Sequence, residues 1–169
     1  YMKIQIKTPA KINLNLKVGE KREDGFHPIE SIMQAVSLFD ILTITLNRDE
    51  KITLSGNNPN IPYNEKNLVY KAIQAYLEEL GEMMFGVDVY IEKNIPTEAG
   101  LAGGSANAAG LLYGLNLLMN EPFTKEELLK SGYKMMLTCN EGISKIYFGN
   151  PKSIYYIKRY NRSGLISTQ

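Results

Sequence analysis

The feature that most constrains the fold is a glycine-rich segment, PTEAGLAGGSAN at residues 96–107, which joins two segments of different periodicity. Before it, residues 87–93 alternate between apolar and polar side chains, which predicts a β-strand. After it, apolar residues recur at the spacing of a helix, and Ser105 is placed to cap that helix. The apolar positions are Ala108, Leu111, Leu112, Leu115, Leu118 and Met119.

Strand patterns dominate the first half of the chain. Two-residue alternation predicts strands at residues 3–8, 12–18, 40–46 and 51–54. Pro9 interrupts the alternation between the strands at 3–8 and 12–18. The polar turn at residues 47–50 favours a hairpin between the strands at 40–46 and 51–54. Residues 28–38 fit either a short helix or a strand.

Capping residues predict two more helices. Asn67 fits the N-cap of a helix that stops at Gly81. Thr124 and Glu127 have the spacing of a capping box, which opens a short helix that stops at Gly132. Because strands come first and a strand–loop–helix unit follows, the order favours an α+β fold with a mixed or antiparallel sheet.

Composition excludes several classes of protein. The 169 residues suit one domain, or one domain and a fragment, and contain no apolar stretch of membrane-spanning length. The N-terminus lacks the apolar core of a signal peptide, and one cysteine, Cys139, cannot form an internal disulfide framework. The formal net charge of +1 argues against broad nucleic-acid binding. We therefore expect a cytoplasmic protein that binds neither a membrane nor a nucleic acid.

The glycine loop has the properties of an anion site. The first turn of a helix leaves N–H groups unpaired, and the helix dipole favours negative charge there. Gly103 and Gly104 lack the Cβ atoms that would keep a phosphate at a distance, and the Ser105 hydroxyl could bond a phosphate oxygen or Mg²⁺. The spacing fits neither of the common nucleotide-binding glycine motifs, and a plain strand-to-helix turn explains the composition equally well.

Four motifs, in order, resemble those of the GHMP kinases, a superfamily of small-molecule kinases. Residues 96–106 resemble the superfamily's phosphate-binding signature, and PAKINL at 9–14 resembles its N-terminal motif. REDGFH at 22–27 is similar to the substrate loop of one member family, and NLVYKA at 67–72 is similar to the helix start on the adenine side. The resemblance is collinear over residues 3–132, and it implies the GHMP kinase N-terminal domain, whose fold resembles a ribosomal-protein domain.

The resemblance implies a site for ATP and Mg²⁺, with Ser105 as the residue beside the metal. Lys93 matches a lysine near the nucleotide, and Asn67 and Leu68 match positions that flank the adenine and ribose. The implied nucleotide-binding residues are Asn67, Leu68, Lys93, Pro96, Gly100, Leu101, Ala102, Gly103, Gly104, Ser105, Ala106 and Asn107.

The resemblance also implies the second substrate, a cytidine diphosphate-linked sugar alcohol whose 2-hydroxyl is phosphorylated in non-mevalonate isoprenoid biosynthesis. Lys11 matches the active-site lysine beside that hydroxyl, where an ammonium can assist its deprotonation or neutralise charge on the transferred phosphoryl group. Asn13 matches a polar residue near the substrate. Phe26 and His27 match a cytidine pocket in which the aromatic ring stacks on the base and the histidine bonds its edge.

The resemblance ends near Gly132, where the family continues with an aspartate that serves as the proposed general base and then with a second domain. Residues 133–169 contain no aspartate and have six Lys and Arg against Glu141 alone, whereas residues 1–132 have 13 against 17 acidic residues. We interpret 1–132 as the ATP- and substrate-binding domain and 133–169 as a divergent tail or fragment without the C-terminal domain.

Three explanations of this break stay open: truncation or a frameshift, omission of residues between joined segments, or a divergent member that binds without turnover. The functional alternatives to a kinase are a nucleotide-binding module without turnover and, less favoured, RNA binding by the tyrosine- and lysine-rich residues 155–160. Residues 145–148 and 154–160 also fit strands.

Overall fold

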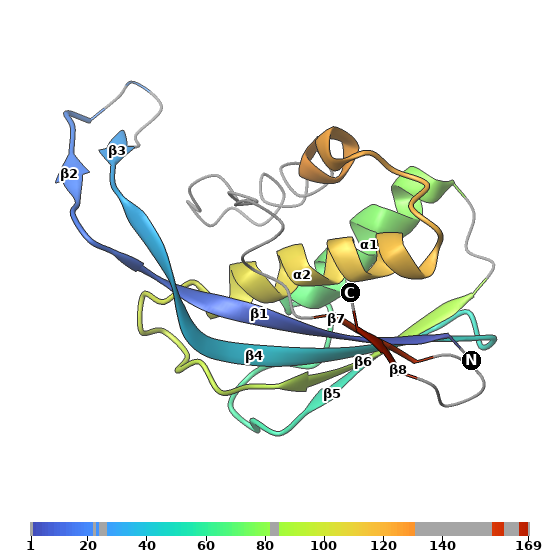
Figure 1. Cartoon of the computed structure of the whole chain (residues 1–169). Helices are drawn as coiled ribbons and strands as arrows, with labels where there is room; N and C mark the ends of the chain where they lie inside the picture. The colour runs from blue at the N-terminus through green and yellow to red at the C-terminus, as the bar shows by residue number, and fades with distance from the viewer. Residues whose placement is uncertain are drawn as a thin grey trace.

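A six-stranded sheet with two helices against one face forms the body of the computed structural model (Figure 1). The structure describes residues 2–21, 23, 27–81 and 85–130, together with the backbone of 157–160 and 166–168. In sheet order the strands are β5 (Ile52–Gly56), β6 (Gly86–Glu92), β4 (Met33–Asn47), β1 (Lys3–Asn13), β7 (Ile157–Tyr160) and β8 (Ile166–Thr168). The helices are α1 (Leu68–Leu80) and α2 (Gly103–Leu118), and a separate two-stranded ribbon joins β2 (Lys17–Val18) to β3 (Ile29–Glu30).

The sheet is mixed, which confirms the predicted α+β fold. Strand β6 pairs in parallel with β5 and antiparallel with β4, and α1 is the connection that allows β5 and β6 to run in the same direction. Strand β1 pairs antiparallel with both β4 and β7. The predicted strand at residues 154–160 is therefore present over Ile157–Tyr160, while the one predicted at 145–148 lies outside the described residues.

The predicted hairpin between residues 40–46 and 51–54 is wrong, because β6 lies between these two strands. The side chains of Val87, Val89 and Ile91 on β6 are all at most 1% exposed. A central position gives this apolar strand a hydrogen-bonded neighbour on each side, whereas a hairpin of β4 with β5 would leave it at an edge with unpaired backbone groups.

Pro9 does not end the first strand as predicted. Strand β1 continues through it to Asn13, and the pairing with β4 shifts register between Pro9 and Lys11. Such a bulge accommodates a residue that has no N–H to donate to the ladder. The second predicted strand at residues 12–18 is correspondingly divided between the end of β1 and the short β2.

The ambiguous segment at residues 28–38 is extended, since it forms β3 and the start of β4. The far ends of β1 and β4 continue beyond the helices toward the β2–β3 ribbon (Figure 1). Large apolar side chains there are exposed, among them Leu14, Leu16 and Ile32 at 55–61%. Only the half of the sheet that lies under the helices therefore carries the buried core.

Helix α2 lies close to β1 because it places glycines against it. An ideal Cβ on Gly110 would come within 2.3 Å of Thr8 Cγ2, and one on Gly114 within 2.5 Å of Ile6 Cδ1. All six apolar positions predicted for this helix lie in α2 or at its C-cap, and five of them are buried: Ala108, Leu111, Leu112, Leu115 and Leu118. No helix among the described residues is long and apolar enough to cross a membrane.

The predicted caps of the other helices are confirmed. The Asn67 side-chain oxygen accepts the Val69 N–H at 2.9 Å, and Gly81 ends α1 in the left-handed conformation, at φ 85°. The Thr124 N–H donates to the Glu127 carboxylate at 2.7 Å, while the Glu127 N–H donates to the Thr124 hydroxyl oxygen at 3.3 Å. This capping box opens a helix at 125–130, and its predicted end at Gly132 lies outside the described residues.

Candidate active site

The glycine loop leads from β6 into the N-terminus of α2, which begins at Gly103. Its N-cap is Ala102, in the left-handed conformation at φ 59° and ψ 25°, and no side chain bonds the cap. The prediction that Ser105 caps this helix is therefore wrong. Because Gly103 and Gly104 already have helical backbone angles, Ser105 lies in the first turn, and the N–H groups of that turn have no side-chain cap.

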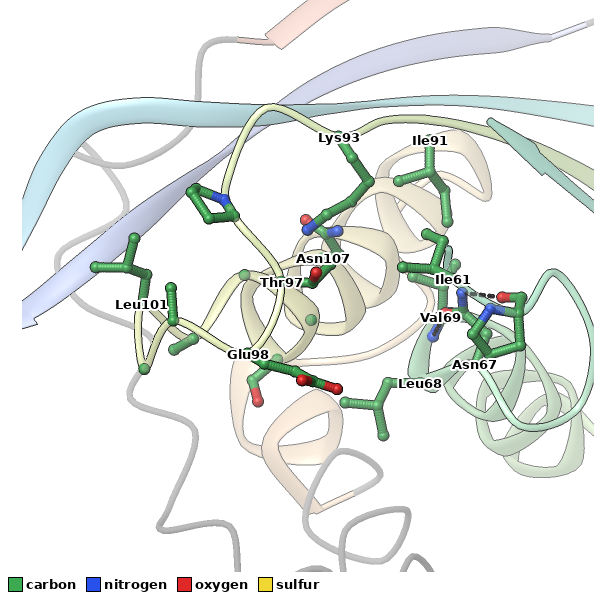
Figure 2. Close-up of a pocket in the computed structure, with 18 of the residues that line it drawn as sticks. Ile61, Asn67, Leu68, Val69, Ile91, Lys93, Thr97, Glu98, Leu101 and Asn107 are labelled. Carbon is green, nitrogen blue, oxygen red and sulfur yellow. Dashed lines mark hydrogen bonds between the residues drawn. The ribbon is translucent and has the colours of Figure 1, made fainter. Parts of the chain in front are cut away.

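A cavity of about 370 Å³ opens in front of this helix end, between two walls (Figure 2). Residues 96–105 form one wall, and residues 61–62 with 66–69 form the other, at the start of α1. Of the residues predicted to bind a nucleotide, only Ala106 does not line the cavity. Those that line it are Asn67, Leu68, Lys93, Pro96, Gly100, Leu101, Ala102, Gly103, Gly104, Ser105 and Asn107.

The wall at the start of α1 is largely apolar, although Lys66 and Asn67 also line it, and it is held together by a hydrogen bond. Ile61, Pro62 and Leu68 contribute apolar surface to the cavity. Besides capping α1, the Asn67 side chain donates from Nδ2 to the Pro62 carbonyl oxygen at 2.7 Å. This amide thus ties the loop before α1 to the helix start, which gives the cavity a rigid side suited to a flat aromatic base.

The opposite wall leaves room for phosphate. An ideal Cβ on Gly104 would meet only Leu68 Cδ1, at 3.5 Å, so this glycine borders open space in the cavity. A Cβ on Gly103 would instead lie 3.0 Å from Lys93 Nζ and 3.1 Å from Ile95 Cγ2. The first turn of α2 therefore rests on Lys93 and Ile95 and presents bare backbone to the cavity. An uncapped helix end beside an apolar wall fits a nucleotide, with its phosphates at the helix.

Lys93 reaches the cavity, but its ammonium already has a partner that sequence reasoning missed. Lys93 Nζ pairs with the carboxylate of Asp40 on β4, and the two side chains are only 5% and 0% exposed. Cavity-lining residues outside the predicted set are Ile61, Pro62, Lys66, Val69, Ile91, Thr97, Glu98 and Ala99.

The structure brings Lys11 to the glycine loop. Its N–H donates to the Leu101 carbonyl oxygen at 3.1 Å, and its ammonium lies 3.5 Å from the Gly100 carbonyl oxygen. The same ammonium lies 3.3 Å from Asn13 Oδ1. Lys11, predicted to face the second substrate, thus contacts the loop predicted to hold the first, and Asn13 lies beside the Lys11 ammonium.

His27 lies elsewhere, where the chain returns from β2 toward β3. Its Nδ1 is 2.9 Å from the Gly19 carbonyl oxygen, its side chain is exposed, and it does not line the cavity. Phe26 lies outside the described residues.

No group of three or more His, Cys, Asp or Glu among the described residues could hold a metal ion. The cavity-lining side chains that offer oxygen to a metal include those of Ser105 and Glu98.

Comparison with known proteins agrees with this geometry. Residues 67–148 match the family described as GHMP kinases N terminal domain, and this span includes the start of α1 and the glycine loop. The 4-diphosphocytidyl-2-C-methyl-D-erythritol kinase of Clostridium tetani is 43% identical over 132 residues, which cover 78% of this chain and 46% of that protein. The protein of the same name from Bacillus cytotoxicus is 39% identical over 160 residues, which cover 93% and 55%.

The chain belongs to the GHMP kinase family. A crystal structure of 4-(cytidine 5'-diphospho)-2C-methyl-D-erythritol kinase superposes with a TM-score of 0.64 at 27% identity, and covers 98% of this chain and 55% of that one. The fold is shared more widely, since the Methanococcus jannaschii mevalonate kinase superposes with a TM-score of 0.62 at 20% identity. The chain spans about half the length of the curated relatives it matches. The match to the Bacillus relative extends past residue 132, where the motif resemblance stops.

Proposed function

We propose that this GHMP kinase chain provides the nucleotide- and substrate-binding part of an ATP-dependent kinase that phosphorylates 4-diphosphocytidyl-2-C-methyl-D-erythritol on its 2-hydroxyl. Residues 1–132 form this domain, and the reaction belongs to non-mevalonate isoprenoid precursor biosynthesis in the cytoplasm. The cavity between the glycine loop and the start of α1 carries the proposal, because it combines an uncapped helix end with an apolar wall. The curated relatives that bear the kinase's name support the choice of substrate.

The lining of the cavity favours one orientation of ATP. Its base lies against Ile61, Pro62 and Leu68, and its phosphates lie at the first turn of α2, where backbone N–H groups and the helix dipole attract anions. The Ser105 hydroxyl is the side chain that would help hold Mg²⁺, which neutralises phosphate charge during transfer.

The second substrate approaches from the side of Lys11. This ammonium lies beside the Gly100 carbonyl within the glycine loop, where it would neutralise charge on the phosphoryl group and stabilise the attacking oxygen. Asn13 helps to hold the Lys11 ammonium, while the exposed His27, with Phe26 before it, would contact the cytidine end. Phosphoryl transfer depends mainly on positioning and charge neutralisation, which these residues supply.

Nucleotide binding and turnover test the proposal separately. The chain is first titrated with ATP and ADP, and then incubated with ATP, Mg²⁺ and the cytidine-linked substrate while ADP release is followed. Substrate-dependent ADP release that falls in Lys11→Ala supports the kinase. Nucleotide binding without turnover would favour the alternative of a binding module, and the absence of nucleotide binding would contradict both.

A further inference from the structure

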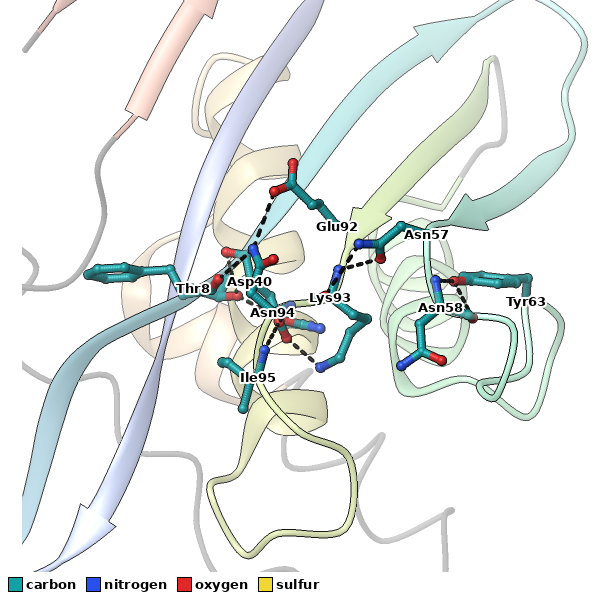
Figure 3. A network of polar contacts seen from close by, with 11 residues as sticks. Thr8, Asp40, Asn57, Asn58, Tyr63, Glu92, Lys93, Asn94 and Ile95 are labelled. Atoms are coloured by element: carbon teal, nitrogen blue, oxygen red, sulfur yellow. Dashed lines mark hydrogen bonds and ion pairs between the residues drawn. The ribbon is translucent and has the colours of Figure 1, made fainter.

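One buried carboxylate, that of Asp40 near the middle of β4, accepts hydrogen bonds from three donors on the residues that directly follow β6 (Figure 3). Its Oδ1 accepts the Asn94 N–H at 2.7 Å and the Ile95 N–H at 2.8 Å. Its Oδ2 pairs with the Lys93 ammonium. Because this carboxylate is fully buried, each of these contacts replaces water that the charge would otherwise bind.

The backbone of Lys93 is held as firmly as its side chain. The Lys93 N–H donates to Asn57 Oδ1 at 2.8 Å, and Asn57 Nδ2 donates back to the Lys93 carbonyl oxygen at 3.3 Å. With its main chain clamped by Asn57 and its ammonium paired with Asp40, Lys93 is fixed at both ends. The orientation of Lys93 seen in Figure 3 is thus held by contacts with Asn57 and Asp40.

The fixed Lys93 lies directly beneath the helix end that faces the cavity. Lys93 Nζ and Ile95 Cγ2 are the two atoms nearest to the position of a Cβ on Gly103, at 3.0 and 3.1 Å. Asp40 binds both of these residues, one through its ammonium and the other through its N–H. The carboxylate thus controls the two groups on which the first turn of α2 rests.

We infer that Asp40 is a positioning residue of the phosphate site: it fixes Lys93 and Ile95 under Gly103, and thereby sets where the first-turn N–H groups of α2 point. In this arrangement Lys93 supports the loop by packing under Gly103, and its positive charge is neutralised by the Asp40 carboxylate. The inference rests on the proposed function only insofar as the anion held by the loop is a nucleotide phosphate.

If Lys93 were instead a direct phosphate ligand, removal of the Asp40 charge would change the phosphate affinity in the opposite direction. If the ammonium bound phosphate, Asp40 would compete for it, and removing the carboxylate's charge would strengthen phosphate binding. If Asp40 positions the loop, the same change lets the support move and weakens phosphate binding. Asp40→Asn separates the two roles because the amide keeps an oxygen for the Asn94 and Ile95 N–H groups and loses only the ion pair.

The experiment compares the wild-type chain with Asp40→Asn, Lys93→Met and the double variant, which removes both charges together. The exposed pair Glu30 and Lys17 supplies matched controls, Glu30→Gln and Lys17→Met, since these side chains are 3.9 Å apart and more than 80% exposed. Dissociation constants are measured for ADP and for adenosine, and amide hydrogen exchange is measured at residues 100–105 without ligand. Circular dichroism establishes which variants fold.

We expect Asp40→Asn to raise the dissociation constant of ADP at least about tenfold, the effect of one misplaced bond to a charged group. The constant for adenosine should stay within about twofold of wild type, because the base wall is untouched. If Asp40→Asn does not fold, hydrogen exchange at residues 100–105 in the double variant decides, because loss of Lys93 would weaken ADP binding under either role. An ADP affinity equal to or tighter than wild type in the folded variants would overturn the inference.

Hydrogen exchange, measured without ligand, tests the positioning role of Asp40 independently of the proposed function. Faster exchange at residues 100–105 in Asp40→Asn or the double variant, with the Glu30 and Lys17 controls unchanged, is the expected result. Unchanged exchange there would overturn the positioning role. A wild-type chain that binds no ADP, yet shows the expected exchange pattern, would overturn the proposed function and leave the positioning role supported.

Discussion

The backbone N–H of Lys11 donates to the carbonyl oxygen of Leu101, with 3.1 Å between nitrogen and oxygen. Strand β7 pairs with β1 over Lys3–Ile6, and farther along β1 the N–H of Lys11 bonds the glycine loop. The lysine motif and the glycine loop, 90 residues apart in sequence, are thereby joined through main-chain atoms. The side chain of Lys11 is thus not required to anchor the loop.

This separation of roles predicts the behaviour of Lys11→Ala. The loop keeps its main-chain bond, so the affinity for ATP should change little, while the phosphoryl transfer rate should fall about 10²-fold or more with the loss of an aimed charge. Titration with ATP in the absence of the second substrate and steady-state kinetics measure the two effects. Lys51→Ala, at an exposed lysine between β4 and β5, is the control and should alter neither. A transfer rate unaffected by Lys11→Ala would contradict the role assigned to this lysine.

Gly104→Ala should separate folding from phosphate binding. The new Cβ would make only an ordinary contact with the protein, 3.5 Å from Leu68 Cδ1, and alanine is the better helix former by about 1 kcal/mol. The thermal midpoint should therefore hold or rise. The methyl group would occupy cavity space in front of the helix N-terminus, so the dissociation constant of ADP should rise about tenfold or more. Tight ADP binding by a stable Gly104→Ala chain would show that phosphate does not approach this glycine.

Local signals in the sequence predicted the helices well. Asn67, Gly81 and the Thr124–Glu127 pair act through backbone bonds within a few residues, and each forms the predicted cap. Ser105 failed as a cap because two glycines before it are free to adopt helical angles, and no local rule decides where such a helix begins. The position of β6 between β4 and β5 depends on tertiary structure, because it gives an apolar strand a hydrogen-bonded neighbour at both edges.

The sequence did contain a signal for Asp40 that pattern reading passed over. Asp40 is in phase with Leu42 and Ile44, which are fully buried on the face of β4 under the helices. A carboxylate at a buried position of an alternating strand requires a charged or hydrogen-bonding partner. The partner, Lys93, is 53 residues away, and only the antiparallel pairing of β4 with β6 places it there.

The close approach of α2 to the sheet predicts that Gly110→Ala is destabilising. An added Cβ would lie 2.3 Å from Thr8 Cγ2, in a packed layer where neither the strand nor the helix can move freely. Overpacking of this kind costs about 1–3 kcal/mol, which urea denaturation would measure. Gly104→Ala, on the same helix but facing the cavity, is the matched control and should show no loss. Equal stability of Gly110→Ala and wild type would mean that α2 lies farther from β1 than the structure places it.

The capping box predicts a pH-dependent contribution from Glu127. The backbone N–H of Thr124, and then its hydroxyl, hold the pKa of the Glu127 carboxyl below its ordinary value of 4.5. A carboxylate whose pKa is lowered by folding stabilises the folded chain above its unfolded pKa, and this contribution is lost as the pH falls through the lowered folded pKa. Glu127→Gln keeps an oxygen for the Thr124 N–H but has no charge to titrate. Wild type should therefore be more stable than Glu127→Gln at about pH 7, and the difference in unfolding free energy should shrink as the pH is lowered below 4.5. Glu126→Gln, at the neighbouring exposed position, is the control, and a Glu127→Gln difference that stays constant down to the acid end would refute the linkage.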